Sequence, residues 1–256
     1  MNRLSKYLII TFSITWSCWL TEAALTNFWA LDLVQYPRVL FVIGGFGPTI
    51  AAALCGEGPF SLRGAAEFLF GHRSRSLWAF GLLALLEILV FALSSDGWAP
   101  VLRQQAVPEI LTAFFIWLQA TLLFGGNEEP GWRGRMQPEL EKRFSTPVAS
   151  LIVGVVWVTW HLPLWLIRGD SHQRTSFMAF AGLGMLLSLW LGALKKRTGS
   201  VLFCMMLHGM TNTLLGTLVI RLNPALLIGL AVLTAVSLWL TRLPKEQKSL
   251  KTGQSE

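Results

Sequence analysis

The sequence predicts an all-α protein, a polytopic bundle of about eight transmembrane helices. Hydrophobic residues make up 53% of the 256 residues and charged residues only 14%, whereas a soluble domain carries roughly 25% charged residues. The apolar runs are about 17 to 23 residues long, which matches the thickness of a bilayer and exceeds a usual core helix. Basic residues collect in alternate connections between these runs, as they do in multi-pass membrane proteins.

Eight apolar segments follow one another along the chain. The first is too long for a cleaved signal peptide, so we interpret it as a retained anchor. Segment 57–76 is basic and amphipathic, which favours the membrane interface, and segment 128–144 is mixed in polarity and predicts a helix that leaves the membrane. We expect one domain over 1–240 and a basic cytoplasmic tail over 241–256. The predicted spans are 7–29, 39–55, 77–94, 107–124, 147–167, 176–194, 200–218 and 224–240.

The distribution of Lys and Arg predicts the orientation of the chain. Of the 21 basic residues, 16 fall in the two termini and alternate connections and 5 in the others. Because cytoplasmic loops carry the excess of basic residues, both termini are predicted to be cytoplasmic, in a cell membrane. The net charge of +7 then reflects the excess of Lys and Arg on the cytoplasmic side, and the expected partner is the lipid bilayer. Nucleic acid is not expected, since no RNA-binding motif or basic stripe with interleaved aromatics occurs.

Two adjacent carboxylates and an arginine stand directly after a Gly-Gly break in an apolar stretch. Glu129 and Arg133 are four residues apart with the acid first, which favours a local ion pair. Glu128 lies about 100° around the helix from Glu129, so we expect it to face the chemistry while the pair holds the helix. Asn127 is expected to cap this helix, with Pro130 in its first turn.

Further polar residues interrupt the apolar segments downstream. His161 stands alone in one span, and His208 and Asn212 share a helical face in another because they are four residues apart. Glu22 and Glu87 either line a polar path or form interhelical hydrogen bonds. Two other histidines, His72 and His172, fall in predicted connections and are expected to be solvated.

These residue types suit the hydrolysis of an acyl bond in a sheltered cavity. A carboxylate can act as a general base on water, and imidazole or amide N–H groups can stabilise an oxyanion. The same atoms also suit zinc, bound by His161, His208 and Glu128 with one position left for water. No H-E-x-x-H or G-x-S-x-G sequence occurs, so a zincin helix and a serine nucleophile elbow are both without support.

The joint pattern resembles a known family. Glu128-Glu129-x-x-x-Arg133, Trp157-x-x-x-His161 and His208-x-x-x-Asn212 follow in the order of the motifs of the CAAX-protease and bacteriocin-processing family of intramembrane proteases. The wordings EEPGWRG and WHLPLW are similar to prokaryotic members, and the resemblance covers about 124–215. An aromatic other than Phe, Trp157, opens the second motif, a position at which many members vary.

The resemblance implies roles for these residues. Glu128 would be the general base with Glu129 beside it, and His161, His208 and Asn212 would complete the site for water and the tetrahedral intermediate. Arg133 and Trp157 would support the site. Family members are described both as metalloproteases and as glutamate-dependent proteases, so zinc on His161, His208 and Glu128 stays open.

The function expected from this resemblance is that of an intramembrane endopeptidase acting on a membrane-associated peptide or protein. Two alternatives remain. One is a catalytically inactive relative that binds peptides as a bacteriocin immunity or scaffold protein. The other is a small transporter, which would be expected to carry inverted repeats and paired broken helices; neither is visible in the sequence.

Overall fold

The computed structural model describes residues 2–29, 32, 38–56, 62–71, 76–103 and 107–244. Most of the predicted tail and His72 lie outside these residues. The longer helices, in chain order, are α1 (Arg3–Phe28), α2 (Val39–Gly45), α3 (Gly47–Leu54), α4 (Leu62–Phe70), α5 (Leu77–Leu93), α7 (Glu109–Leu122), α10 (Thr146–Trp160), α11 (Phe177–Thr198), α12 (Val201–Thr217) and α13 (Pro224–Arg242). The short elements are β1 (Ser95–Trp98), α6 (Pro100–Arg103), η2 (Gly126–Glu128), α8 (Glu129–Gly131), η3 (Trp132–Met136), α9 (Gln137–Leu140), η4 (Leu162–Leu166), η5 (Ser171–Arg174) and β2 (Leu218–Ile220).

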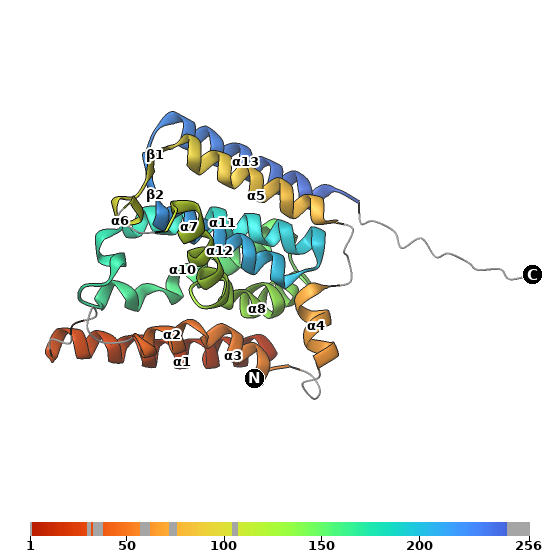
Figure 1. Cartoon of the computed structure of the whole chain (residues 1–256). Helices are drawn as coiled ribbons and strands as arrows, with labels where there is room; N and C mark the ends of the chain where they lie inside the picture. Colours follow the sequence, from red (N-terminus) through yellow and green to blue (C-terminus); the bar gives the residue numbers. More distant parts are fainter. Residues whose placement is uncertain are drawn as a thin grey trace, which may run out of the picture.

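The helices form three layers (Figure 1). One outer layer holds α1, on which α2 and α3 pack, and the other holds α5 and α13, which pack on each other. Between them lie α7, α8, α10, α11 and α12, with close packing of α10 on α11 and of α7 on α12. The helices that carry the polar motifs are therefore enclosed on two sides.

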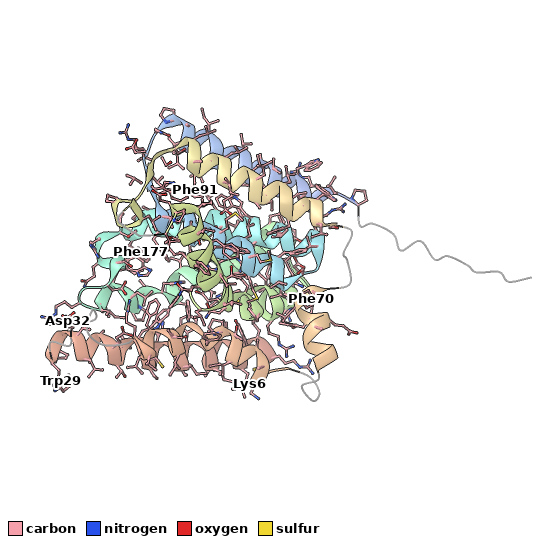
Figure 2. All side chains as sticks on the ribbon, in the orientation of Figure 1. Lys6, Trp29, Asp32, Phe70, Phe91 and Phe177 are labelled. Carbon is pink, nitrogen blue, oxygen red and sulfur yellow. The ribbon has the colours of Figure 1, made fainter. Side chains whose placement is uncertain are left out.

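Each of the eight predicted apolar segments contains a helix. Within the described residues, five helices are long and apolar enough to cross a membrane, and α5 and α12 are apolar helices of 17 residues. Lys6 and Phe70 lie at one end of the molecule and Trp29 and Asp32 at the other (Figure 2). The start of α1 and the end of α13 share the first of these ends. The count of eight spans and the cytoplasmic termini stay predictions.

A small sheet modifies the predicted all-α fold. β1 pairs antiparallel with β2, with Ser95 opposite Ile220 and Trp98 opposite Leu218. The strands are three and four residues long and more than a hundred positions apart, so no hairpin turn or alternating pattern in the sequence announces them. The sheet joins the ends of α5 and α12 at the end of the molecule away from α4.

The second predicted span is a broken helix. It divides into α2 and α3 at Phe46, whose N–H bonds back into α2. Gly47 packs so closely on α1 that a Cβ there would lie 2.1 Å from the Thr15 hydroxyl oxygen. Thr15 in turn donates to the Gly44 carbonyl at 2.6 Å. The break thus packs the backbone of α2 and α3 closely against α1.

Segment 128–144 begins inside the body of the protein. Residues from Gly125 to Arg133 are buried, and the chain continues through η2, α8, the π-helical turn η3 and α9 with changing pitch. Pro130 and Pro138 lack the N–H that a regular helix needs, which explains why the hydrogen-bond pattern shifts. Such π-turns are frequent at functional sites.

Candidate functional site

The two adjacent carboxylates stand on a turn held by Asn127. Its side-chain oxygen accepts from the Gly125 N–H at 2.9 Å and its amide donates to the Gly45 carbonyl at 3.0 Å. Its backbone carbonyl accepts from the Thr49 hydroxyl. The prediction that Asn127 caps a helix is therefore wrong, because its side chain is used to tie the turn to the α2–α3 break.

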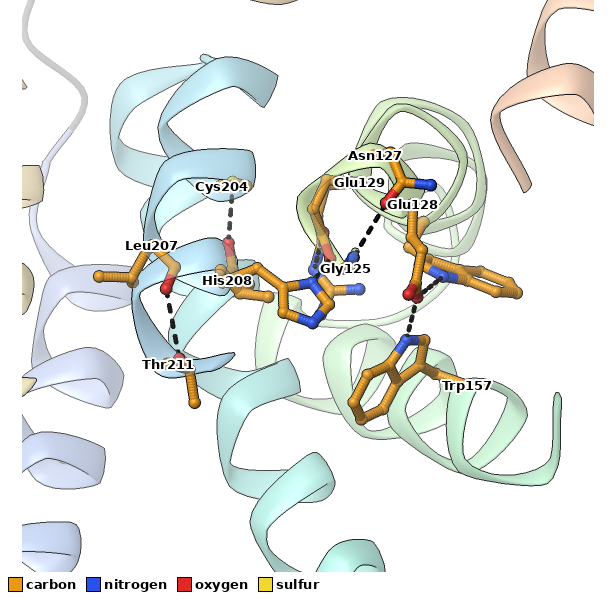
Figure 3. Close-up of polar contacts among 12 residues, drawn as sticks. Gly125, Asn127, Glu128, Glu129, Trp157, Cys204, Leu207, His208 and Thr211 are labelled. Carbon is orange, nitrogen blue, oxygen red and sulfur yellow. Dashed lines mark hydrogen bonds and ion pairs between the residues drawn. The ribbon is translucent and has the colours of Figure 1, made fainter. Parts of the chain in front are cut away.

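Glu128 has one carboxylate oxygen saturated and the other facing His161. Oε2 accepts from the Trp157 indole N–H at 2.5 Å and from that of Trp132 at 3.2 Å (Figure 3). Oε1 lies 4.0 Å from His161 Nε2, which is too far for a direct hydrogen bond. Glu128 is 5% exposed. The two indoles therefore orient the carboxylate and leave Oε1 as its reactive atom.

His161 stands at the point where α10 ends and η4 begins. Its Nδ1 lies 2.8 Å from the Trp157 carbonyl oxygen. A carbonyl can only accept, so Nδ1 carries the proton and Nε2 presents its lone pair in the neutral ring. The Trp157 residue thus contributes twice, with its indole to Glu128 and its backbone to His161.

Glu129 joins Arg133 and His208. Its Oε2 lies 3.4 Å from Arg133 Nε, which confirms the predicted ion pair. Its Oε1 lies 2.8 Å from His208 Nδ1, a contact that the helix geometry alone did not predict (Figure 3). Arg133 also donates to the Ser188 hydroxyl at 3.1 Å, so the ion pair connects η3 to α11. All of these charged side chains are nearly fully buried.

Gly125 brings the turn against the last two motif residues. Its φ is +122°, and a Cβ there would lie 2.3 Å from Asn212 Nδ2 and 3.0 Å from His208 Nε2. Asn212 donates to the Phe124 carbonyl at 2.8 Å. Only glycine satisfies both the backbone conformation and the close approach. The two nitrogens consequently converge on one turn of the chain.

A cavity of about 720 Å³ connects these groups. Glu128, Trp157, His161, His208 and Asn212 all line it, whereas Glu129 and Arg133 do not. Its walls are otherwise largely apolar, and its outer part reaches η5 and the start of α11. The apolar lining includes Trp19, Phe41, Ile116, Leu123, Phe124, Leu164, Phe180, Leu183 and Leu215.

His172 also lines this cavity, which corrects the expectation that it is solvated. Its Nδ1 lies 2.6 Å from Asp170 Oδ1, and its ring centre is 6.3 Å from that of His161. Asp170 Oδ2 contacts Arg38 at 2.6 Å. Burial raises the pKa of Asp170, but hydrogen bonds from His172 and the charge of Arg38 outweigh it and hold the pKa below its usual range. The sequence signal was the spacing Asp170-x-His172, which is weak in isolation.

The intramembrane acids Glu22 and Glu87 have different partners. Glu22 forms an ion pair with Arg38 at 2.7 Å, so it belongs to the Asp170 cluster. Glu87 accepts from the Thr211 hydroxyl, an interhelical hydrogen bond of the kind expected for such residues. Neither acid lines the cavity among the described residues.

The proposed zinc ligands fit a metal only in part. The tautomer of His161 and the carboxylate on His208 Nδ1 both suit metal ligation, because each leaves Nε2 with a lone pair. Among the described side chains, however, no three His, Cys, Asp or Glu residues converge as a metal site. In this arrangement Glu128, His161 and His208 face one cavity but do not close around one point.

Comparison with known proteins connects this site to a family. Residues 110–214 match the family model described as type II CAAX prenyl endopeptidase Rce1-like. The chain is 33% identical over 101 residues to the CAAX prenyl protease 2 of Methanococcus maripaludis, and this match covers 36% of each chain. The chain thus aligns with about a third of the length of that relative. The residues matched by the family model include all three motifs.

Proposed function

We propose that this chain, whose segment 110–214 matches the type II CAAX prenyl endopeptidase Rce1-like family, is an intramembrane endopeptidase. The family and the apolar helices make it a multi-pass membrane protein. We propose the cell membrane as its location and a membrane-associated peptide or protein as its substrate. The observation that carries the proposal is the carboxylate of Glu128, oriented by two indoles and open on one side to a cavity.

Glu128 acts as the general base in this proposal. Its Oε1 accepts a proton from a water held between the carboxylate and His161, and the water oxygen attacks the carbonyl carbon of the scissile bond. The 4.0 Å gap between Oε1 and His161 Nε2 is too long for a direct hydrogen bond, and a water that bonds to both atoms can bridge a gap of this kind. The proton then passes to the leaving nitrogen as the C–N bond breaks.

A side-chain N–H of Asn212 stabilises the oxyanion of the tetrahedral intermediate, and His208 Nε2 lies beside it. Both nitrogens approach Gly125 closely, beside the turn that carries Glu128, and an amide donor is typical of such sites. Glu129 acts through His208 by holding its Nδ1 at 2.8 Å, as a carboxylate orients a functional histidine. Arg133 balances the charge of Glu129.

Proteolysis by the purified protein tests this proposal. The protein, in detergent and in liposomes, is incubated with membrane-associated peptides, some with and some without a prenylated cysteine, and products are identified by mass spectrometry. Glu128→Gln keeps the size and the indole contacts but removes the base, so we expect cleavage to fall about 10²- to 10⁴-fold with unchanged thermal stability. Cleavage at the wild-type rate by the variant, or no cleavage of any peptide by the wild type, would contradict the proposal.

A further inference from the structure

The cavity holds a second polar end besides the carboxylate turn. Asp170 is 2% exposed, and its carboxylate accepts hydrogen bonds from His172 Nδ1 at 2.6 Å and from the His172 backbone N–H at 2.9 Å. The rings of Trp165 and Phe180 pack around the imidazole, with centres at 5.0 and 5.7 Å. The ring is thereby fixed in position and orientation, although η5 is a short surface turn.

The grip on Nδ1 leaves the other ring nitrogen available. Asp170 is in turn anchored by Arg38, which also bonds Glu22 on α1 and stacks on Phe41 at 4.0 Å. Among the described residues, His172 Nε2 has no hydrogen-bond partner, while the side chain lines the cavity and is 21% exposed. The His172 ring is therefore held in place while its Nε2 atom has no partner, and such a group is suited to binding a ligand in the cavity.

The distance between His172 and the Glu128 carboxylate is short enough for one peptide to contact both. The His161 ring is 6.3 Å from that of His172, and His161 Nε2 is 4.0 Å from Glu128. Laid end to end, these two steps put His172 within roughly 11 Å of the carboxylate, a distance that about three residues of extended chain can span. The walls between the two ends are largely apolar, with Phe41 and Phe180 among them.

We infer that His172 is a substrate-positioning residue, whose Nε2 accepts a hydrogen bond from the peptide within about three residues of the scissile bond. The group it binds is a backbone N–H of the substrate, because the Asp170 carboxylate accepts the Nδ1 proton and leaves Nε2 with a lone pair. The inference deepens the proposed function and rests on it. None of the three sequence motifs contains His172 or Asp170, so the contact is an additional determinant of substrate length.

Peptide length and a side-chain variant together test this inference. His172→Phe keeps the ring packing and removes the hydrogen bond, and we expect it to raise KM about 3- to 10-fold with little change in kcat on a long peptide. His172→Gln restores an amide at this position and should recover part of the loss. Gln173→Ala is the matched control, because Gln173 belongs to the same turn and bonds Gly169 and Trp165 but does not line the cavity.

The decisive measurement uses peptides shortened on one side of the scissile bond at a time. When the peptides are shortened past the residue that His172 contacts, wild type and His172→Phe should have the same KM. A KM ratio that is the same for all lengths, or a fall in kcat alone, would overturn the inference. Cleavage of long peptides by the wild type and its loss in Glu128→Gln keep the proposed function independent of this outcome.

Discussion

Two regions of the molecule repeat one arrangement at different depths. At the carboxylate turn, Glu129 holds His208 at 2.8 Å and Arg133 at 3.4 Å. At the outer end of the cavity, Asp170 holds His172 at 2.6 Å and Arg38 at 2.6 Å. In both, one carboxylate fixes the Nδ1 of a histidine and is balanced by an arginine.

The two arrangements differ in burial and in the elements that carry them. Arg133 and His208 have side chains 3% and 2% exposed, whereas Arg38 and His172 are 26% and 21% exposed. The inner one joins packed helices, and the outer one joins a short turn to the segment before α2. An uncompensated charge costs more free energy in the interior than near water. The same contacts should therefore contribute more to folding in the inner cluster than in the outer one.

The largest expected effect is on stability when the inner arginine is removed. Arg133→Ala leaves Glu129 charged and buried, so we expect a loss of about 3–5 kcal/mol and a lower folded yield. Arg38→Ala should cost less, about 1–3 kcal/mol, because its site is closer to solvent. Thermal unfolding in one detergent compares the two variants. Equal losses would contradict the expectation that the inner cluster contributes more to folding than the outer one.

A pair of glycine variants separates backbone strain from site geometry. Gly125→Ala meets both the positive φ and the nitrogens of His208 and Asn212, so activity should fall on the order of 100-fold. Gly169→Ala, near the outer cluster, has φ +86° but nothing within 4 Å of the added Cβ. It should cost only the strain of the left-handed region, about 1–2 kcal/mol. Peptide cleavage and unfolding are measured for both, and a fully active Gly125→Ala would contradict the geometry.

The outer cluster should respond to acid. The pKa of Asp170 is held below its usual range, and so its contribution to stability is present above the unfolded value of about 3.9. This contribution is lost as the pH falls through the lower, folded pKa. The difference in unfolding temperature between wild type and Asp170→Asn should therefore shrink below about pH 4. A difference that stays constant down to pH 3 would show that Asp170 contributes no charge interaction.

The smallest expected effect is that of metal removal. If Glu128 activates water by itself, cleavage survives exhaustive chelation, and purified active protein contains no stoichiometric zinc. His208, held by Glu129, and His172, held by Asp170, then both serve as positioned hydrogen-bonding groups. Loss of activity on chelation with recovery on addition of zinc would instead show that His208 is a metal ligand. The inner cluster would then bind metal, and the outer cluster would not.

Much of the outline could be predicted from the order of residues. Bilayer thickness imposes a length on each apolar run, so helices fall in all eight predicted segments. Helical spacing also predicted the ion pair of Glu129 with Arg133, because partners four residues apart on one helix meet whatever surrounds them. The motif order connected Glu128, His161 and His208 without any knowledge of distance.

Tertiary packing decided the rest. The contact of Glu129 with His208, the binding of Glu128 by two indoles and the approach of Gly125 to Asn212 join different helical elements, so local periodicity carries no information about them. The β1–β2 pair and the role of Asn127 depend in the same way on chain segments far apart in sequence. His172 and Asp170 are close in sequence, yet only the packing of η5 against the cavity distinguishes them from an ordinary surface turn. Sequence spacing determines contacts within one helix, whereas contacts between helices depend on how their faces are packed.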